Sequence, residues 1–192
     1  DYRTYEITQI HTDEIYDCNR VTCPCGLSRE LESRFSAIAV RLAELVSLHG
    51  IMDVETILHN GVLKVLEIDA RLPSQTPTAI YHSTGINFVA ELAALFTGRL
   101  PRADYSPSKR EKHTVFAHVK ACTGSVCFPG EHIMASRAPV CVYDSLFGAD
   151  EVITDWKPDD AEMCATLIAS AGTREAAQAR FDGIISTIQE NL

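Results

Sequence analysis

MDVETILHNGVLKVLEIDARLPSQTP, the stretch from Met52 to Pro77, decides the fold. Two apolar segments flank the pair Asn60-Gly61, which is a strong local signal for a β-hairpin. Four acidic residues fall within these two segments: Asp53, Glu55, Glu67 and Asp69. The pattern raises the question of why a hairpin that is predicted to be buried carries so many carboxylates.

The register of the hairpin decides which acids meet, because side chains alternate between the two faces of a strand. A two-residue turn at Asn60-Gly61 would put Glu55 and Glu67 on opposite faces. A three-residue loop from His59 to Gly61, with Gly61 left-handed, would place Asp53 across from Glu67. All four acids then share one face, and the other face is apolar: Met52, Val54, Leu66 and Ile68. We predict the three-residue loop because it separates acidic from apolar residues better.

Four carboxylates on one face repel one another, and each loses hydration if that face is covered. Either the face is open to water or a cation neutralises it. Mg²⁺ and Mn²⁺ prefer oxygen ligands and are often bound by carboxylates together with substrate phosphates. Arg71 follows with the same parity, and a guanidinium there can hold a phosphate or an acyl phosphate. The pattern alone leaves both alternatives open: a solvated acidic edge, or a metal site.

The rest of the chain predicts an α+β fold with antiparallel pairing. Strands are expected at residues 2–10, 18–24, 113–121, 125–128, 131–135, 139–143 and 164–169. Helices are expected at residues 29–49 and 86–97, and after Thr173, where Ala177, Phe181, Ile184 and Ile188 share a face. We expect residues 72–85 to be a loop and residues 99–112 to be an exposed linker or mobile loop.

Composition narrows the class of protein. The chain has 192 residues, of which 46% are hydrophobic, enough for one domain or two small ones. No apolar run reaches the roughly 18 residues of a membrane span, and the net charge of −9 argues against nucleic acid or an anionic membrane as partner. Seven irregularly spaced cysteines favour reduced thiols in a cytoplasmic protein over disulfides or a zinc site. Because the chain begins at Asp1 rather than Met, we expect a trimmed or partial chain.

The segment Glu67-Ile68-Asp69-Ala70-Arg71 resembles the metal-binding strand of the ATP-grasp superfamily, whose usual pattern is E-x-N-x-R. The resemblance implies that Glu55, Glu67 and Asp69 bind Mg²⁺ or Mn²⁺ against ATP, with Glu67 also contacting this cofactor. It implies that Arg71 is catalytic and stabilises the transferred group. Asp69 stands where Asn is commoner. The three residues that follow this strand are the expected substrate-binding residues: Ser74, Gln75 and Thr76.

Several further segments narrow the resemblance: YDCNRVTCP, VLEIDARLPSQTP, TGIN, GEHIM and FGADEVITDW. Together they resemble the ATP-grasp ligases of pyrrolysine biosynthesis, which join 3-methyl-D-ornithine to the ε-amine of L-lysine. The resemblance implies that residues 1–100 are the C-terminal portion of the catalytic core, an antiparallel sheet with packed helices, and that residues 101–192 are a small C-terminal α/β subdomain. Family members are longer and carry an ATP-gripping glycine-rich loop that this sequence lacks. We therefore expect a C-terminal half that works with the N-terminal half of the same enzyme.

Three alternatives stay open at this point: another ATP-grasp ligase for amino acids or peptides, a non-catalytic half that pairs with an ATP-binding chain, and an acidic binding module. Glu131 and His132 in the segment GEHIM either reach the amine substrate or support a strand. His82 and Ser83 are further candidates for the substrate pocket, whereas His113 and His118 are expected to be surface or strand residues. No Ser-His-Asp or Cys-His arrangement has a spacing that favours a covalent nucleophile.

Overall fold

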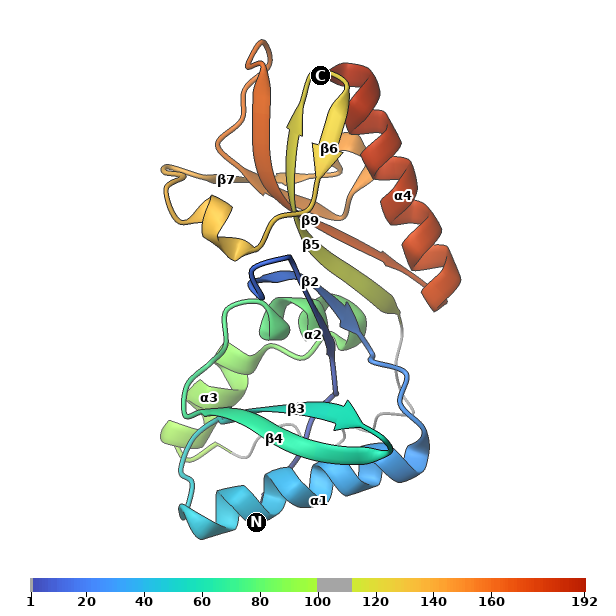
Figure 1. Cartoon of the computed structure of the whole chain (residues 1–192). Coiled ribbons are helices and arrows are strands. Elements are labelled where there is room, and N and C mark those ends of the chain that lie inside the picture. The colour runs from blue at the N-terminus through green and yellow to red at the C-terminus, as the bar shows by residue number, and fades with distance from the viewer. Residues whose placement is uncertain (1, 100–111) are drawn as a thin grey trace.

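Two sheets organise the computed structural model, which describes residues 2–99 and 112–192 (Figure 1). The large sheet has the strand order β1-β2-β5-β9-β8-β7, and β6 pairs with β5 beside this path. Its strands are β1 (Gln9–Thr12), β2 (Cys18–Cys23), β5 (His113–Cys122), β6 (Ser125–Cys127), β7 (Cys141–Asp144), β8 (Glu151–Thr154) and β9 (Glu162–Ala171). The second sheet is the hairpin of β3 (Asp53–His59) and β4 (Val62–Asp69).

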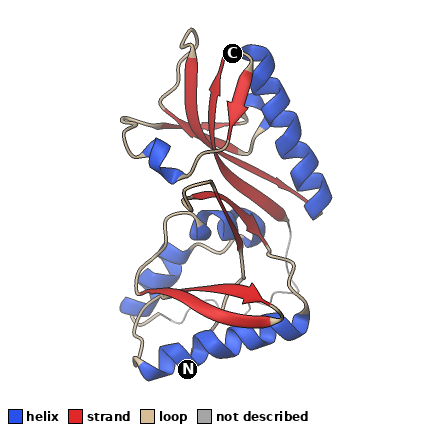
Figure 2. Cartoon of the chain, viewed as in Figure 1, coloured by secondary structure: helices blue, strands red, loops and turns tan. Residues whose placement is uncertain are grey.

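Four α-helices and two short 3₁₀ helices accompany the sheets in the described residues (Figure 2). They are α1 (Arg29–Leu45), α2 (Thr76–Thr84), α3 (Phe88–Phe96), α4 (Arg174–Asn191), η2 (Glu131–Met134) and η3 (Leu146–Gly148). In Figure 1 the hairpin lies between α1 and the pair α2 and α3, while α4 runs along the large sheet. Every strand pair in the described part is antiparallel. The predicted α+β class with an antiparallel sheet and packed helices is therefore confirmed.

The large sheet buries a hydrophobic core on each face. On one face the side chains of β5 and β9 pack against α4, and the core includes Val119, Leu167, Phe181, Ile184 and Ile188. Thr173 begins α4 as predicted, because its hydroxyl accepts a hydrogen bond from the amide of Ala176 at 3.1 Å. The opposite face of the sheet packs against α2, with Val21, Ile80, Phe116 and Ile168 in its core. β5 thus contributes side chains to both cores, as alternation along a strand requires.

Several predicted elements were wrong. The strand expected at residues 2–10 begins only at Gln9 and continues to Thr12, because the ladder with β2 starts at the pair of Gln9 and Thr22. The expected loop at 72–85 contains α2, which has Pro77 in its first turn and ends at the left-handed Gly85. The segment 131–135, expected to be a strand, contains the 3₁₀ helix η2. Strand β8 was not predicted. Helix α1 ends at Leu45, four residues before the predicted end at His49.

The predicted linker falls almost wholly outside the described residues, since only its two end residues lie within them. The division of the chain near residue 100 stays a prediction. β2 and β5 pair across that division, so strands from both parts form one sheet. No helix in residues 2–99 and 112–192 is long and apolar enough to cross a membrane. All seven cysteines are free thiols.

Candidate functional site

The acidic hairpin forms with a different register from the one predicted. Its turn has two residues, Asn60 and Gly61, and both have positive φ, at 50° and 76°. A register shift then occurs beyond Glu55, because Thr56 pairs with Val65 while Glu55 pairs with Glu67. This shift is a β-bulge, which inserts one extra residue into β4 and changes the parity of everything beyond it.

The β-bulge places the four acids on one face, whereas the prediction relied on a three-residue loop to do so. Asp53 lies opposite Asp69, and Glu55 lies opposite Glu67. Directly opposed residues of an antiparallel pair point to the same face. The prediction that the four carboxylates share a face is thus confirmed, although the three-residue loop and the pairing of Asp53 with Glu67 were wrong.

Burial and crowding of these acids raise the pKa of two of them, Asp53 and Glu55. Burial raises the pKa of Asp53, and the charges of Asp69 and Glu67 raise it further. Burial also raises the pKa of Glu55, with further contributions from Asp53, Glu67 and Asp69. A carboxylate whose pKa is raised in this way is short of positive charge. The face therefore favours a cation, and its oxygen donors are of the type that Mg²⁺ or Mn²⁺ prefers.

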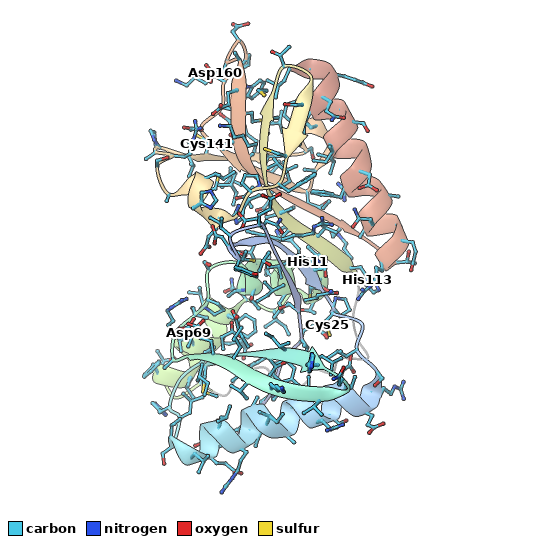
Figure 3. The ribbon with its side chains drawn as sticks, in the orientation of Figure 1. His11, Cys25, Asp69, His113, Cys141 and Asp160 are labelled. Atoms are coloured by element: carbon cyan, nitrogen blue, oxygen red, sulfur yellow. The ribbon has the colours of Figure 1, made fainter. Side chains whose placement is uncertain are left out.

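Arg71 is the cation that the chain itself supplies to this face. Its guanidinium lies 2.9 Å from the carboxylate of Asp69 and is largely exposed. Its positive charge lowers the pKa of Asp53 and of Glu55, but both pKa values remain raised. Asp69 lies at the end of the hairpin away from the turn, where the chain leaves towards α2 (Figures 1 and 3). An exposed guanidinium at this end can bind an anionic group that approaches the acids.

Ser74 and Gln75 bind a residue distant in sequence rather than open solvent. The Ser74 hydroxyl and the Gln75 side-chain amide both donate to Oε2 of Glu131, at 3.2 and 2.6 Å. Gln75 is only 7% exposed, so its amide group serves mainly to position Glu131. Thr76 begins α2 and is half-buried. The structure therefore joins two of the three predicted substrate-binding residues to the segment GEHIM.

Cys18 also contacts Gln75, the residue that holds Glu131. Its thiol donates to Oε1 of Gln75 at 2.7 Å, which fixes the orientation of the amide. Burial raises the pKa of the Cys18 thiol to about 12, and the negative charges of Glu131 and Glu55 contribute to the increase. The thiol is therefore protonated at neutral pH and available as a donor. Cys18 is therefore near enough to both Glu131 and Glu55 for each charge to affect its thiol.

A second set of contacts holds η2 in place. Asp17 accepts hydrogen bonds from the backbone amide and the ring Nδ1 of His132, at 3.0 and 2.6 Å. Asp13 accepts from the amide of Gly130 at 2.8 Å, and a side chain at Gly130 would collide with Asp17. Asp13, Asp17 and His132 offer three possible metal-ligand atoms within 4.8 Å of one another. Backbone amides already bind these carboxylates, so the group acts as a clamp between the β1–β2 loop and η2.

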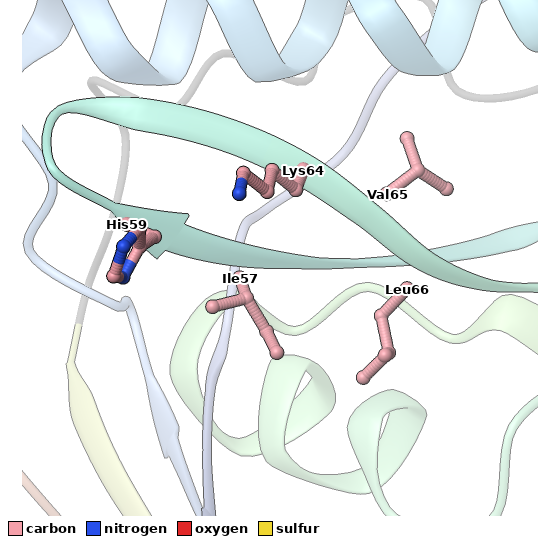
Figure 4. A pocket seen from close by; sticks show the side chains of 5 residues that line it. All are labelled: Ile57, His59, Lys64, Val65 and Leu66. Carbon is pink, nitrogen blue, oxygen red and sulfur yellow. The ribbon is translucent and has the colours of Figure 1, made fainter.

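An open hollow of about 390 Å³ lies on the hairpin near its turn (Figure 4). It is lined by Ile57, His59, Lys64, Val65 and Leu66. The hollow is mainly apolar and does not include the four acids. Many other large hydrophobic residues of the hairpin are also exposed, among them Leu58, Val62 and Ile68. Exposed apolar surface of this kind usually marks a place where another part of a protein binds.

The predicted metal-binding, catalytic and substrate-binding residues lie along one stretch of the chain, whereas the further candidates have other contacts: His82 lies 3.4 Å from Glu151, and Ser83 donates to the carbonyl of Lys112 at 2.6 Å. The hairpin acids and Arg71 form one end of this stretch, and Ser74 and Gln75 lead from there to Glu131. The sequence did not indicate Cys18 or Asp17 as members of the region, and for Glu131 it left open whether the residue reaches the amine substrate or supports a strand. The single sequence signal for them was the presence of Asp17, Cys18 and Glu131 in the quoted family-like segments. The roles of Glu55, Glu67 and Asp69 as metal ligands, of Glu67 as a cofactor contact and of Arg71 as a catalytic residue stay predictions.

Comparison with solved structures identifies this architecture. N5-carboxyaminoimidazole ribonucleotide synthetase, solved as an ADP complex, matches with a TM-score of 0.62 at 13% identity, over 97% of this chain and 45% of that one. The biotin carboxylase domain of Hydrogenobacter thermophilus 2-oxoglutarate carboxylase, solved with MgADP and bicarbonate, matches with a TM-score of 0.62 at 17% identity, over 92% of this chain and 40% of that one. Both are ATP-grasp proteins.

The chain has the ATP-grasp fold. Among curated proteins, this ATP-grasp chain is 39% identical over 129 residues to 3-methyl-D-ornithine–L-lysine ligase of Methanosarcina mazei, over 67% of the chain and 33% of that protein. The same ligase of Methanosarcina barkeri is 38% identical over 129 residues, with 67% and 34% covered. The chain spans about a third of the length of these relatives. No protein-family model matches the sequence.

Proposed function

We propose that this chain is part of an ATP-dependent carboxylate–amine ligase that joins 3-methyl-D-ornithine to the ε-amine of L-lysine in pyrrolysine biosynthesis. The observation that carries the proposal is the face of two opposed acid pairs with Arg71 at its end. That face occurs in an ATP-grasp chain whose curated relatives are named for this reaction.

The acidic face suits a divalent cation. Glu55, Glu67 and Asp69 would hold Mg²⁺ or Mn²⁺, and their uncompensated repulsion gives the physical reason to bind it. The ion would supply charge neutralisation, which an anionic carboxylate needs in order to approach the anionic γ-phosphate of ATP. Glu67 would also contact the nucleotide at this site.

The reaction proceeds in two balanced steps. A carboxylate oxygen of 3-methylornithine bonds to the γ-phosphorus of ATP as the bond to the ADP oxygen breaks. The lysine amine, after losing a proton, bonds to the acyl carbon, and phosphate leaves. Arg71 stabilises the transferred phosphoryl group, and its exposed guanidinium is free to turn from Asp69 towards it. In the proposal Ser74, Gln75 and Thr76 position the carboxylate substrate, Ser74 and Gln75 through Glu131, whose carboxylate they hold.

The proposal includes a second part of the same enzyme. The relatives are about three times as long as the matched region, and the exposed apolar hairpin offers a surface for that part to cover. The N-terminal half would supply the groups that grip ATP. The free cysteines, three of which are exposed, suit a reducing compartment, so we place the enzyme in the cytoplasm.

The test is ADP release by the chain alone and by the chain extended at its N-terminus to the length of its relatives. The extended protein should release ADP only when 3-methyl-D-ornithine (or D-ornithine) and L-lysine are both present. The chain alone should release little ADP, because the proposal assigns most of the ATP-binding groups to the N-terminal half. Folded extended protein that binds Mg-ATP but ignores this substrate pair would favour another ATP-grasp amino-acid or peptide ligase.

A further inference from the structure

His118 of β5 has a ring nitrogen with no hydrogen-bond partner in the described residues. The side chain is 4% exposed, and its Nδ1 lies 2.9 Å from the hydroxyl of Thr166. The other nitrogen, Nε2, is buried and unpaired. Buried polar atoms nearly always have a partner, and an exception in a folded protein needs an explanation. A bound ligand is one such explanation.

The sheet places a second unpaired atom beside this ring. Val115, Ala117 and Val119 point to the α4 face, so His118 points to the opposite face, with Phe116. The β2–β5 ladder ends at the pair of Arg20 and Ala117, and one position beyond it Asn19 would stand opposite His118. The side-chain oxygen of Asn19 is also buried and unpaired, while its nitrogen donates to the carbonyl of Phe128 at 2.9 Å. Two neighbouring strands of the sheet therefore each carry a buried polar atom with no partner among the described residues.

Charged groups around His118 show which region its ring adjoins. Burial lowers the pKa of His118, whereas Glu131 and Asp17 raise it and His132 lowers it. These three residues belong to the β1–β2 loop and η2, the elements joined by the clamp described above. The ring is neutral at neutral pH as a net result of burial. The proposal takes the tautomer with its proton on Nδ1: in that form the ring donates to the Thr166 hydroxyl and Nε2 presents a lone pair.

Glu131, an exposed residue of η2, offers a third acceptor. Its Oε2 is held by Ser74 and Gln75, and its Oε1 has no hydrogen-bond partner among the described residues. Gln75 stands just before α2, the helix that packs on the same face of the sheet as His118. Glu131 thus supplies one charged acceptor, and Asn19 and His118 supply two neutral ones. Both neutral side chains already donate an N–H, Asn19 to Phe128 and His118 to Thr166. A primary ammonium group carries three N–H donors and no acceptor, and it matches this set.

We propose that Glu131, Asn19 and His118 form the subsite for the α-ammonium group of the amino acid whose carboxylate the enzyme activates. The inference rests on the proposed function and adds the recognition of that substrate. Its place agrees with the chemistry, because Cys18 is near enough to both Glu131 and Glu55 for each charge to raise the pKa of its thiol. In the proposal, an α-amino acid with its ammonium at Glu131 directs its carboxylate towards the acidic face.

The test is steady-state ADP release by the extended protein with L-lysine, comparing D-ornithine with 5-aminopentanoate, which lacks only the α-amine. The wild type should prefer D-ornithine. Glu131→Gln should raise the KM for D-ornithine roughly tenfold or more and leave the KM for ATP unchanged, because a charged hydrogen bond is lost only there. His118→Gln should also reduce the preference over 5-aminopentanoate. Glu190→Gln, an exposed change at the end of α4, is the matched control and should behave like the wild type.

The outcomes separate the two proposals. Variants that lose the preference for the α-amine while they keep the KM for ATP support the subsite. Wild-type turnover with an unchanged preference in both folded variants overturns the subsite and leaves the ligase function standing. A folded wild type that turns over neither amino acid overturns the function and the subsite together.

Discussion

Glu55→Gln should stabilise this chain in the absence of divalent cations. Glu55 lies directly opposite Glu67, and its pKa is raised by burial and by Asp53, Glu67 and Asp69. Like charges directly opposite on a sheet destabilise it by about 0.2–1 kcal/mol. Glu55 is only half-buried, so solvent screens part of the repulsion. We expect a gain of about 0.5–1 kcal/mol at pH 7, or roughly 1–4 °C in Tm for a domain of this size.

The pH dependence of this gain has a definite sign. Because the pKa of Glu55 is raised in the folded state, its carboxyl favours folding at acid pH, and that contribution is lost as the pH rises through the folded-state pKa. The advantage of the variant should therefore be present at pH 7 and vanish below about pH 4, where both forms are neutral. Millimolar Mg²⁺ should stabilise the wild type and largely remove the advantage.

The assay is urea unfolding in EDTA at pH 7 and near pH 4, then at pH 7 with Mg²⁺. Glu14→Gln, in the exposed turn between β1 and β2, is the control and should change stability at neither pH. A Glu55→Gln variant that is less stable than the wild type in EDTA at pH 7 would refute the reasoning. A gain that persists unchanged at pH 4 would show that packing, and not charge, is the cause.

Three further predictions concern catalysis and folding. Glu67→Gln in the extended protein should lower kcat about 10²-fold or more with an unchanged circular dichroism spectrum, since a charge at the transferring group is lost; near wild-type turnover would exclude the metal role. Thr173→Ala should cost about 1 kcal/mol through loss of the α4 cap, measured as a lower urea midpoint, whereas Thr173→Ser should not. Phe181→Ala should cost about 3–5 kcal/mol, because this ring is fully buried between α4 and the sheet, and a normal urea midpoint would contradict that packing.

The sequence predicted the shared acidic face but not how it forms. Alternation showed that two registers were possible, and the separation of acidic from apolar residues chose between them. The structure keeps the two-residue turn and restores the separation with a bulge beyond Glu55. A bulge has no reliable signal in a single sequence, because it depends on what packs against each face. The sequence could therefore predict that the four acids share one face, but not which residues pair across the hairpin.

Tertiary packing explains the other differences. The segment before Gly85 has many turn-favouring residues, yet burial of Ala79 and Ile80 against the sheet makes it helical. The contacts of Gln75 with Cys18 and Glu131 join residues 57 and 56 positions apart, which no local pattern encodes. His118 alternates correctly as a strand residue, but its unpaired nitrogen is visible only once its neighbours are known.

Transfer of an oxygen atom from the substrate carboxylate to phosphate would show directly that the ligase reaction passes through an acyl phosphate. D-Ornithine labelled with ¹⁸O in its carboxylate would be incubated with ATP, Mg²⁺, L-lysine and the extended protein, followed by mass spectrometry of the phosphate and the amide. The account predicts amide product together with one ¹⁸O atom in each phosphate released, because the acyl phosphate passes that oxygen on. Amide formed with unlabelled phosphate, or ATP cleaved with no amide from this substrate pair, would contradict it.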